Sequence, residues 1–417
     1  MAIYKIKGAK ELSGTVTVGG SKNAILPAMC ATLLTKDACV IRNVPEISDV
    51  YNLKSILEKL GSTVTFEDHV LTIDNSKVES FKPDPELVKK LRGSILLLGP
   101  LLARFGKVVM PIPGGDLIGK RPIDAHLVAL EMLGAKTKID GLLEVSTKKL
   151  VGANIIMVEL SVTATENAIM AAVTATGSTV IHLAATEGHI QSLCHMLNSM
   201  GAMISGIGTH DLVIAGVEKL HGTDFKIIHD NEVACSFINL AAATKSELTI
   251  QNVHPEFLAA AFIQFMQMNV NFEVGDTWVK VLKPKEEYTA FKITSNIYPG
   301  LMSDYIPPFA VLATQAQGTT QLHEWMYEGR LGYIHELSKM GAKAHIIDQH
   351  RAEITGPTEL SGTDVSSLDV RSGMVLVIAA LVAKGESTLH EIQHIERGYE
   401  DIVNKLKAIG ADIERVD

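Results

Sequence analysis

The sequence holds little that would suit a metal site, a nucleic-acid surface or a membrane span. Its four cysteines, Cys30, Cys39, Cys194 and Cys235, stand among apolar neighbours with no Cys-x-x-Cys or Cys/His ligand spacing, so we expect buried thiols and no bound metal. No run is rich in Lys and Arg, and the formal net charge of -9 argues against broad nucleic-acid binding. The longest apolar runs are helix-sized and no signal-peptide core opens the chain, which predicts a cytoplasmic protein without a membrane partner.

The composition is otherwise that of a globular protein with more than one core. Hydrophobic residues make up 47% of the chain and charged residues 20%, whereas aromatic residues make up only 5%, so aliphatic side chains must do most of the packing. A length of 417 residues exceeds what one hydrophobic core usually serves. We therefore expect two domains.

A helix that ends at glycine and turns into a strand recurs six times. The phrases that share this form are LEKLGSTVTF, LEMLGAKTKI, LNSMGAMISG, MQMNVNFEV, LSKMGAKAHI and LKAIGADIERV. Their predicted caps are spaced 67 to 73 residues apart: Gly61, Gly134, Gly201, Asn269, Gly341 and Gly410. Glycine, or asparagine once, suits a left-handed helix C-cap. The spacing indicates six copies of one unit.

Each copy carries a second helix, roughly forty residues before its cap. These helices, such as GSILLLGPLLARFG and GMVLVIAALVAKG, are rich in Ala, Leu and Val on all sides, which predicts burial on most sides. Short β-branched runs such as CVIRNV and STVIHL follow them and predict strands. Each copy therefore has the predicted order βαβαββ, with one buried helix and one more exposed helix.

The sixth copy is truncated, because the chain ends six residues after Ala411. Residues 1–21, with the strand-like segments AIYKIKG and GTVTVGG, are well placed to complete it. We expect an α/β (α+β) protein with two similar domains, formed by residues 22–229 (copies 1 to 3) and by residues 1–21 plus 230–417 (copies 4 to 6). Two facing domains of this kind would leave a cleft for a ligand.

Cations recur where the copies begin their helices: Lys22, Arg92, Arg121, Arg330, Arg371 and Arg397. A cation there is unfavourable by about 0.3–1 kcal/mol, because a helix N-terminus carries positive partial charge. Helix starts that converge, each with N–H groups and a cation, make a strong site for phosphate and carboxylate. Any one arginine could equally pair with a nearby acid, but six cations at equivalent positions favour an anion site.

The acidic residues and histidines near these starts have simpler interpretations. Asp230 and Asp304 suit ordinary N-caps, although SDYIPP places Asp304 in an irregular turn flanked by prolines. We expect hydrogen-bonded structural histidines at four positions: His126, His189, His323 and His394.

Several longer motifs resemble one known family. They are GGSKNAILPA, LRGSILLLGPLLARFG, PGGDLIGKRPIDAHL, LSVTATENAIMAA, YEGRLGYIHELSKMGA, DVRSGMVLVIAAL and HIERGYEDIVNKLKAIGADIER, and the similarity runs in order from residue 3 to 417. The chain resembles the UDP-N-acetylglucosamine 1-carboxyvinyltransferases, a family of enolpyruvyl transferases. The resemblance implies an inside-out α/β barrel in each of two domains, with three βαβαββ units apiece. It also implies transfer of enolpyruvyl from phosphoenolpyruvate to the 3-hydroxyl of UDP-N-acetylglucosamine, with release of phosphate, as the committed step toward peptidoglycan.

The resemblance also implies which residues bind the two substrates. Lys22, Arg121 and Arg397 would hold the phosphate side of phosphoenolpyruvate. Arg330 and Arg371 would hold its carboxylate. Two further residues would line the same pocket, Asn23 and Arg92. The positions that would hold the sugar nucleotide are Arg121, Pro122, Ile123, Asp124, Ala125, Glu159, Leu160, Ser161, Val162, Asp304 and Met326.

The implied chemistry needs an acid and a base. Addition delivers a proton to C3 of phosphoenolpyruvate and removes one from the sugar hydroxyl, and elimination of phosphate from the tetrahedral adduct reverses both movements. Asp304 is the candidate base and Asp116 the candidate acid. Asp116 lies in PGGDLIGKRPID, residues 113–124, which we interpret as a lid that closes over bound sugar nucleotide and expels water, rather than as a charged surface turn. No cofactor is implied.

The chain departs from the family pattern at a few positions. Most members carry cysteine where this chain has Asp116, and fosfomycin alkylates that cysteine, so we expect insensitivity to the drug because a carboxylate is a far poorer nucleophile. Ser48 and Glu159 stand where lysine is common, and the acids after Asp230 are placed differently. Glu159 brings negative charge to the predicted diphosphate contacts, so a modified sugar nucleotide is an alternative acceptor.

Two other functions stay open at this stage. One is an enolpyruvyl transferase acting on a different nucleotide or on a shikimate-type acceptor, although RPIDAHL and LSVTATEN favour the sugar-nucleotide type. The other is a non-catalytic paralogue that binds UDP-sugars, against which the retained set of charged site residues argues. The oligomeric state is left open between a monomer and a weak homo-oligomer.

Overall fold

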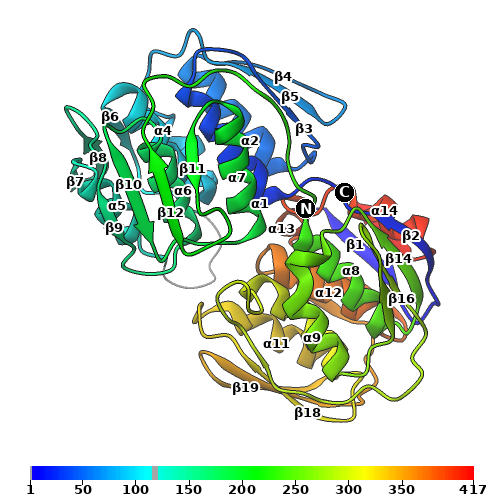
Figure 1. Cartoon of the computed structure of the whole chain (residues 1–417). Coiled ribbons are helices and arrows are strands. Elements are labelled where there is room, and N and C mark those ends of the chain that lie inside the picture. The colour runs from blue at the N-terminus through cyan, green and yellow to red at the C-terminus, as the bar shows by residue number, and fades with distance from the viewer. Residues whose placement is uncertain (1, 115–120) are drawn as a thin grey trace. The chain divides into compact units, whose positions relative to one another are not determined.

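The computed structural model describes residues 2–114 and 121–417, which group into two compact units. Residues 20–114 and 121–228 form one, here called the 20–228 unit. Residues 2–19 and 229–417 form the other, here called the 229–417 unit. Figure 1 follows the chain through the helices and strands of each unit.

Each unit contains three buried helices. In the 20–228 unit they are α1 (Lys22–Ala31), α4 (Leu98–Phe105) and α6 (Val162–Ala172). In the 229–417 unit they are α8 (Asn231–Ala243), α10 (Ile306–Ala313) and α12 (Val370–Val382). Helix α10 contacts both α8 and α12, and α4 contacts α6. Every residue of α8 is buried, which confirms the burial predicted from apolar residues on all sides.

The more exposed helices end as the repeated phrases predict. They are α2 (Ser48–Leu60), α5 (Asp124–Met132), α7 (Gly188–Ser199), α9 (Ala259–Gln267), α11 (Tyr333–Lys339) and α14 (Ile402–Ala408). All six predicted caps have φ between 61° and 113°, the left-handed region that glycine enters without strain. Beyond each cap an amide returns to the last turn, as from Ala135 N to Leu130 O at 3.1 Å.

Shorter helical pieces complete the described chain. They are α3 (Pro85–Lys90), α13 (Gln393–Glu396), and the 3-10 turns η1 (Thr32–Leu34), η2 (Arg92–Leu97), η3 (Pro255–Leu258), η4 (Ser303–Tyr305) and η5 (Arg330–Gly332). Within residues 2–114 and 121–417, no helix is long and apolar enough to cross a membrane. All four cysteines are free thiols and are buried, as predicted.

Three sheets belong to the 20–228 unit. In spatial order, the first holds β13 (Asp224–Lys226), β3 (Cys39–Arg42), β5 (Val70–Asp74) and β4 (Thr63–Glu67). The second holds β6 (Lys107–Met110), β8 (Leu142–Ser146) and β7 (Lys136–Asp140). The third holds β11 (Met203–Ser205), β12 (Asp211–Ala215), β10 (Ser178–His182) and β9 (Asn154–Ile156).

Three further sheets belong to the 229–417 unit. The first holds β15 (Phe272–Val274), β16 (Trp278–Val281), β14 (Glu247–Gln251) and β2 (Ser13–Thr17). The second holds β17 (Ile293–Thr294), β18 (Gly318–His323), β20 (Arg351–Gly356) and β19 (Lys343–Asp348). The third holds β21 (Asp364–Ser366), β22 (Glu386–His390), β1 (Ile3–Lys7) and β23 (Asp412–Val416).

The sheets share one pattern, which bears out the predicted α/β repeat. In each four-stranded sheet, the strand that follows the buried helix has an edge strand on one side, parallel to it, and a hairpin on the other side, antiparallel to it. In the second sheet of the 229–417 unit, for example, β18 pairs in parallel with β17 and antiparallel with β20 of the β19–β20 hairpin. The strand runs predicted at CVIRNV and STVIHL are β3 and β10. The repeat therefore produces the same α/β unit along the chain.

The N-terminal strands are placed only partly as expected. Strand β1 completes the sixth copy by pairing antiparallel with β22 and β23, with Ile3 opposite Val416, so the chain ends meet. Strand β2 does not join it, because it pairs in parallel with β14 of the fourth copy. The strand leading into that copy, β13, pairs instead with β3 of the first copy. The two leading strands are thus exchanged, and each fills a sheet edge that would otherwise expose unpaired backbone groups.

The one cap that is not glycine gives a test of the repeat. Replacing Asn269 (φ 61°) by alanine should lower the free energy of unfolding by about 1–2 kcal/mol, because alanine keeps the Cβ but lacks the polar side chain that lets asparagine adopt this conformation. As a control, Asn269→Gly should stay within about 1 kcal/mol of wild type, since glycine removes the strain and loses two exposed hydrogen bonds, to Glu287 O and Thr289 Oγ1. Urea denaturation would measure both, and equal losses would contradict the argument.

Candidate active site

Asp304 lies at the start of buried helix α10, in the short turn η4. Pro307 and Pro308 occupy the first turn of α10, and proline has no N–H for an acidic side chain to cap. The structure records no side-chain cap on this helix. The Asp304 carboxylate is therefore available to groups outside its own helix, and the simple interpretation of Asp304 as an N-cap is wrong.

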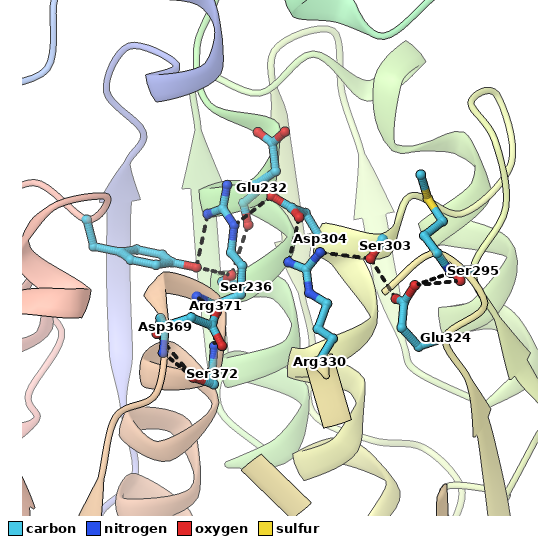
Figure 2. Close-up of polar contacts among 12 residues, drawn as sticks. Glu232, Ser236, Ser295, Ser303, Asp304, Glu324, Arg330, Asp369, Arg371 and Ser372 are labelled. Carbon is cyan, nitrogen blue, oxygen red and sulfur yellow. Dashed lines mark hydrogen bonds and ion pairs between the residues drawn. The ribbon is translucent and has the colours of Figure 1, made fainter. Parts of the chain in front are cut away.

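Two arginines bind this carboxylate in the 229–417 unit. Arg330 Nη2 lies 2.5 Å from Asp304 Oδ1, and Arg371 Nε lies 3.0 Å from Oδ2 (Figure 2). The Arg330 and Arg371 side chains are only 4% and 5% exposed, whereas Asp304 is 30% exposed. Three of the predicted site residues, from two successive copies, thus meet in one buried group of two cations and one anion.

The arginines decide the charge state of Asp304. Burial raises the pKa of Asp304, but the positive charges and hydrogen bonds of Arg330 and Arg371 lower it by more, so the net pKa lies well below the ordinary value. Burial lowers the pKa of Arg330, and the negative charges of Asp304, Asp369 and Glu324 together more than reverse that effect. All three groups are therefore charged at neutral pH.

Arg330 is also held from its other side. Its Nη1 donates to Ser303 Oγ at 2.8 Å, and Ser303 Oγ donates to Glu324 Oε2 at 2.6 Å. The Nε of Arg330 is a buried donor with no partner among the described residues. A buried guanidinium with an unused donor is suited to receive an acceptor from a ligand.

Arg371 begins buried helix α12 in a defined orientation. Asp369 and Ser372 form a capping box there, with Arg371 N donating to Asp369 Oδ1 at 2.8 Å. Arg371 Nη1 donates to Tyr399 Oη at 3.4 Å, and Tyr399 Oη lies 2.9 Å from Ser236 Oγ of α8. The helix start and the tyrosine therefore fix the two ends of this side chain.

Glu232 lies in the first turn of α8, near Arg371. Burial raises the pKa of Glu232 well above its ordinary value, the negative charge of Asp230 raises it further, and Arg371 opposes both. Asp230 itself is the N-cap of α8, with Oδ1 accepting from Val233 N at 2.9 Å. The simple interpretation of Asp230 as a cap is thus confirmed, and Glu232 is a buried carboxyl group whose pKa lies well above its ordinary value.

The 20–228 unit carries its own cluster of predicted site residues. Lys22 begins α1, and its Nζ lies 3.3 Å from Asp49 Oδ2 in the first turn of α2. Ser21 caps α1 by accepting from Ala24 N. The α1 start therefore carries a cation whose counter-ion comes from the next helix of the same copy.

Arg92 binds the backbone at two described residues of the predicted lid, residues 113–124. Its Nη1 donates to Pro113 O at 3.3 Å and its Nη2 to Arg121 O at 2.6 Å. Both acceptors therefore belong to the predicted lid itself. Asp116, the predicted acid, lies outside the described residues.

A buried histidine connects the two stretches predicted to hold the sugar nucleotide. His126 of α5 bonds through Nδ1 to Asn167 Nδ2 at 2.9 Å and through Nε2 to Thr163 Oγ1 at 3.1 Å. Burial lowers the pKa of His126 to about 3, with the charge of Arg92 adding to the effect. The ring is therefore neutral and accepts at Nδ1, so the predicted structural role of His126 is confirmed.

The remaining predicted residues are placed as follows. Arg121, Pro122 and Ile123 precede α5, and Asp124 and Ala125 open it. Glu159 and Leu160 precede α6, Ser161 caps it by accepting from Ala164 N, and Val162 opens it. In the 229–417 unit, Met326 follows β18, and Arg397 follows α13. Asn23 is the second residue of α1.

Sequence reasoning missed several residues of the Asp304 group: Ser236, Ser303, Glu324, Asp369 and Tyr399. Of these, Asp369 carried a signal, because DVRS before an apolar run fits a capping box. The others stand far apart in the chain and reach the group only through folding.

Comparisons with known proteins identify the class. The family model for EPSP synthase (3-phosphoshikimate 1-carboxyvinyltransferase) matches residues 6–406. Among solved structures, the enolpyruvyl transferase NikO from Streptomyces tendae matches with a TM-score of 0.90 and 25% identity, over 100% of this chain and 99% of that one. An EPSP synthase from Acinetobacter baumannii shares the fold, with a TM-score of 0.79 at 19% identity over the full length of both chains. The fold is that of the enolpyruvyl transferases.

More similar sequences define the family within this class. The UDP-N-acetylglucosamine 1-carboxyvinyltransferase of Treponema denticola is 42% identical over 99% of this chain and 98% of its own. The relative of the same name from Borreliella burgdorferi is 43% identical over 100% of this chain and 99% of its own. The chain belongs to the UDP-N-acetylglucosamine 1-carboxyvinyltransferase family.

The Asp304 ion pairs give a pH-dependent test. Asp304→Asn should lower the free energy of unfolding by about 3 kcal/mol near pH 7, because two buried guanidinium groups lose their shared anion. The folded pKa lies below the ordinary value of about 3.9, so this stabilisation is complete above that pH and is lost as the pH falls below it. The difference between wild type and variant should therefore narrow below about pH 4.

Urea denaturation followed by circular dichroism at several pH values would measure this difference. Asp276→Asn, at an exposed position of the same unit, is the control and should change little at any pH. A difference that stays constant from neutral to acid pH would contradict the assignment of the ion pairs.

Proposed function

We propose that this chain transfers enolpyruvyl from phosphoenolpyruvate to the 3-hydroxyl of UDP-N-acetylglucosamine, with release of phosphate, as the first committed step of peptidoglycan synthesis. The observation that carries the proposal is the buried group of Asp304, Arg330 and Arg371, which provides an anion site and a carboxylate base side by side. Membership of the family supports the choice of substrates.

The charge of this group suits the carboxylate of phosphoenolpyruvate. Asp304 neutralises one of the two guanidinium groups, so one positive charge is left for a substrate anion. A carboxylate bound by charge-assisted hydrogen bonds would be held in a fixed orientation, which favours reaction at the adjacent carbon.

Binding of that carboxylate also prepares Asp304 to act as the base. In the absence of substrate, Arg330 and Arg371 hold the pKa of Asp304 well below its ordinary value, so it is a weak proton acceptor. A substrate carboxylate that shares the two arginines weakens their effect on Asp304. The pKa of Asp304 then rises, and it becomes better suited to accept the proton of the sugar hydroxyl.

The other proposed contacts are those that the family resemblance implies. Lys22, Arg121 and Arg397 would bind the phosphate that leaves, and the start of α1 adds backbone N–H groups beside Lys22. The sugar nucleotide would lie along Arg121–Ala125 and Glu159–Val162, whose helices are joined through His126. Asp116 would donate the proton to C3.

The same acceptor remains the best choice despite the unusual Glu159. This side chain is exposed, so water screens its charge and its repulsion of a diphosphate is small. We propose the unmodified sugar nucleotide as acceptor. We also propose that the protein acts in the cytoplasm, as a monomer or a weak homo-oligomer without a cofactor.

Phosphate release is the direct test. Wild type should release phosphate only when phosphoenolpyruvate and UDP-N-acetylglucosamine are both present. Asp116→Asn should lower kcat by about 10²- to 10⁴-fold while it still binds UDP-N-acetylglucosamine in a calorimeter, because only the proton donor is removed. Asp140→Asn, exposed in the same unit, is the matched control. No release by wild type would refute the function, and full release by Asp116→Asn would refute the acid.

Fosfomycin provides a second test of Asp116. Wild type should keep its activity after incubation with the drug, whereas Asp116→Cys should lose activity progressively, since a thiolate opens the epoxide far faster than a carboxylate. Residual phosphate release against incubation time is the measurement. Time-dependent loss in the wild type would contradict the role given to the aspartate.

A further inference from the structure

Glu324 is a buried carboxylate that lies behind the Asp304 group and takes no part in the mechanism described above. It follows β18 and is 0% exposed. Its two oxygens accept three hydrogen bonds: from Ser303 Oγ at 2.6 Å, from Ser295 Oγ at 3.2 Å and from Met326 N at 2.9 Å. A buried carboxylate with this many donors is a fixed part of the structure.

The hydrogen bonds through Ser303 have only one possible direction. A guanidinium can only donate and an ionised carboxylate can only accept. The Ser303 hydroxyl therefore accepts from Arg330 Nη1 and donates to Glu324 Oε2 (Figure 2). Glu324 thus sets the rotation of the hydroxyl, and the hydroxyl sets the position of the guanidinium that binds Asp304.

The other oxygen of Glu324 acts on a different predicted contact. Oε1 accepts from the backbone N–H of Met326, the position expected to touch the sugar nucleotide. It also accepts from Ser295, whose Oγ in turn accepts from Trp325 N at 3.1 Å. Glu324 therefore holds the backbone of residues 325–326 and, through Ser303, also holds Arg330 beside Asp304.

We propose that Glu324 is a positioning residue for the reaction. It fixes the position of Met326, the expected sugar-nucleotide contact, relative to the Arg330–Asp304 ion pair. The inference rests on the proposed function for its substrates. It assigns to Glu324 no contact with either substrate.

Glutamine is the informative replacement at this position. It has nearly the same shape, but it offers one acceptor oxygen and one donor nitrogen in place of two acceptor oxygens. Whichever way the amide turns, its nitrogen faces either the Ser303 hydroxyl or the Met326 N–H and Ser295 hydroxyl, all of which donate. The hydrogen bond donated by the Ser303 hydroxyl is therefore lost in one orientation, and the one donated by Met326 N–H is lost in the other.

The experiment compares Glu324→Gln with Glu336→Gln in steady-state phosphate release. Glu336 is also buried and accepts a backbone bond, from Ser366 N at 3.0 Å, as well as an ion pair from Lys339. Both variants should lower the melting temperature. Only Glu324→Gln should lower kcat/KM for UDP-N-acetylglucosamine, by about 100-fold, because small misplacements of reacting groups have effects of this size.

Ser303 tests the connection itself. Ser303→Ala should lower kcat/KM to a similar extent, and Ser303→Thr should keep it near wild type because threonine keeps the hydroxyl. The double variant Ser303→Ala/Glu324→Gln should lose less activity than the product of the two single losses, because both side chains act through the same hydrogen bonds. Four results would each overturn the proposal. The first two are fully multiplicative losses in the double variant and low activity in Ser303→Thr. The other two are a kcat/KM of Glu324→Gln within twofold of wild type and an equal loss in Glu336→Gln.

A spectroscopic measurement keeps the proposal testable if the proposed function fails. The chain has two tryptophans, so in a Trp278→Phe background the emission comes from Trp325, whose backbone N–H bonds to Ser295 Oγ. Glu324→Gln should shift this emission and Glu336→Gln should not. Absence of phosphate release by wild type would refute the function alone, whereas an unchanged Trp325 emission in Glu324→Gln would refute the positioning role alone.

Discussion

The shared ion pair of Asp304 with Arg330 and Arg371 is the interaction on which the 229–417 unit's site depends. Two guanidinium groups that are almost fully buried need an anion within reach, and Asp304 supplies one charge for two cations. The incomplete neutralisation leaves the group able to accept a second anion. The same contacts hold the pKa of Asp304 well below its ordinary value and keep it ionised.

A repeated fold explains how residues so far apart in sequence reach this group. Asp304 and Arg330 stand before the buried and the exposed helix of the fifth copy, and Arg371 begins the buried helix of the sixth. Because α10 and α12 contact each other, their starts lie together. Around them lies a layer of neutral or acceptor groups, Ser303, Glu324 and Tyr399, which restricts each arginine to one orientation.

Much of the fold was predictable because its signals are local. Left-handed caps, apolar helices and β-branched strands depend on a few neighbouring residues, and all six caps are confirmed. The pairing of β2 with β14 was not predictable, because strand partners depend on which sheet edge is left open in the folded chain. Resemblance identified the predicted site residues by type, whereas the acceptors that orient them carry no motif.

The sequence by itself determined the repeat, the positions of its helix starts and the family, because each of these depends on the residue pattern of short stretches of the chain. It also places Asp116 at the position where the resemblance implies a cysteine in most members. Only the tertiary structure decided that Arg330 and Arg371 share one carboxylate, that Glu324 lies behind them, and that β1 and β2 enter different sheets. These facts depend on distances between residues remote in sequence, and such distances exist only once the buried helices have packed.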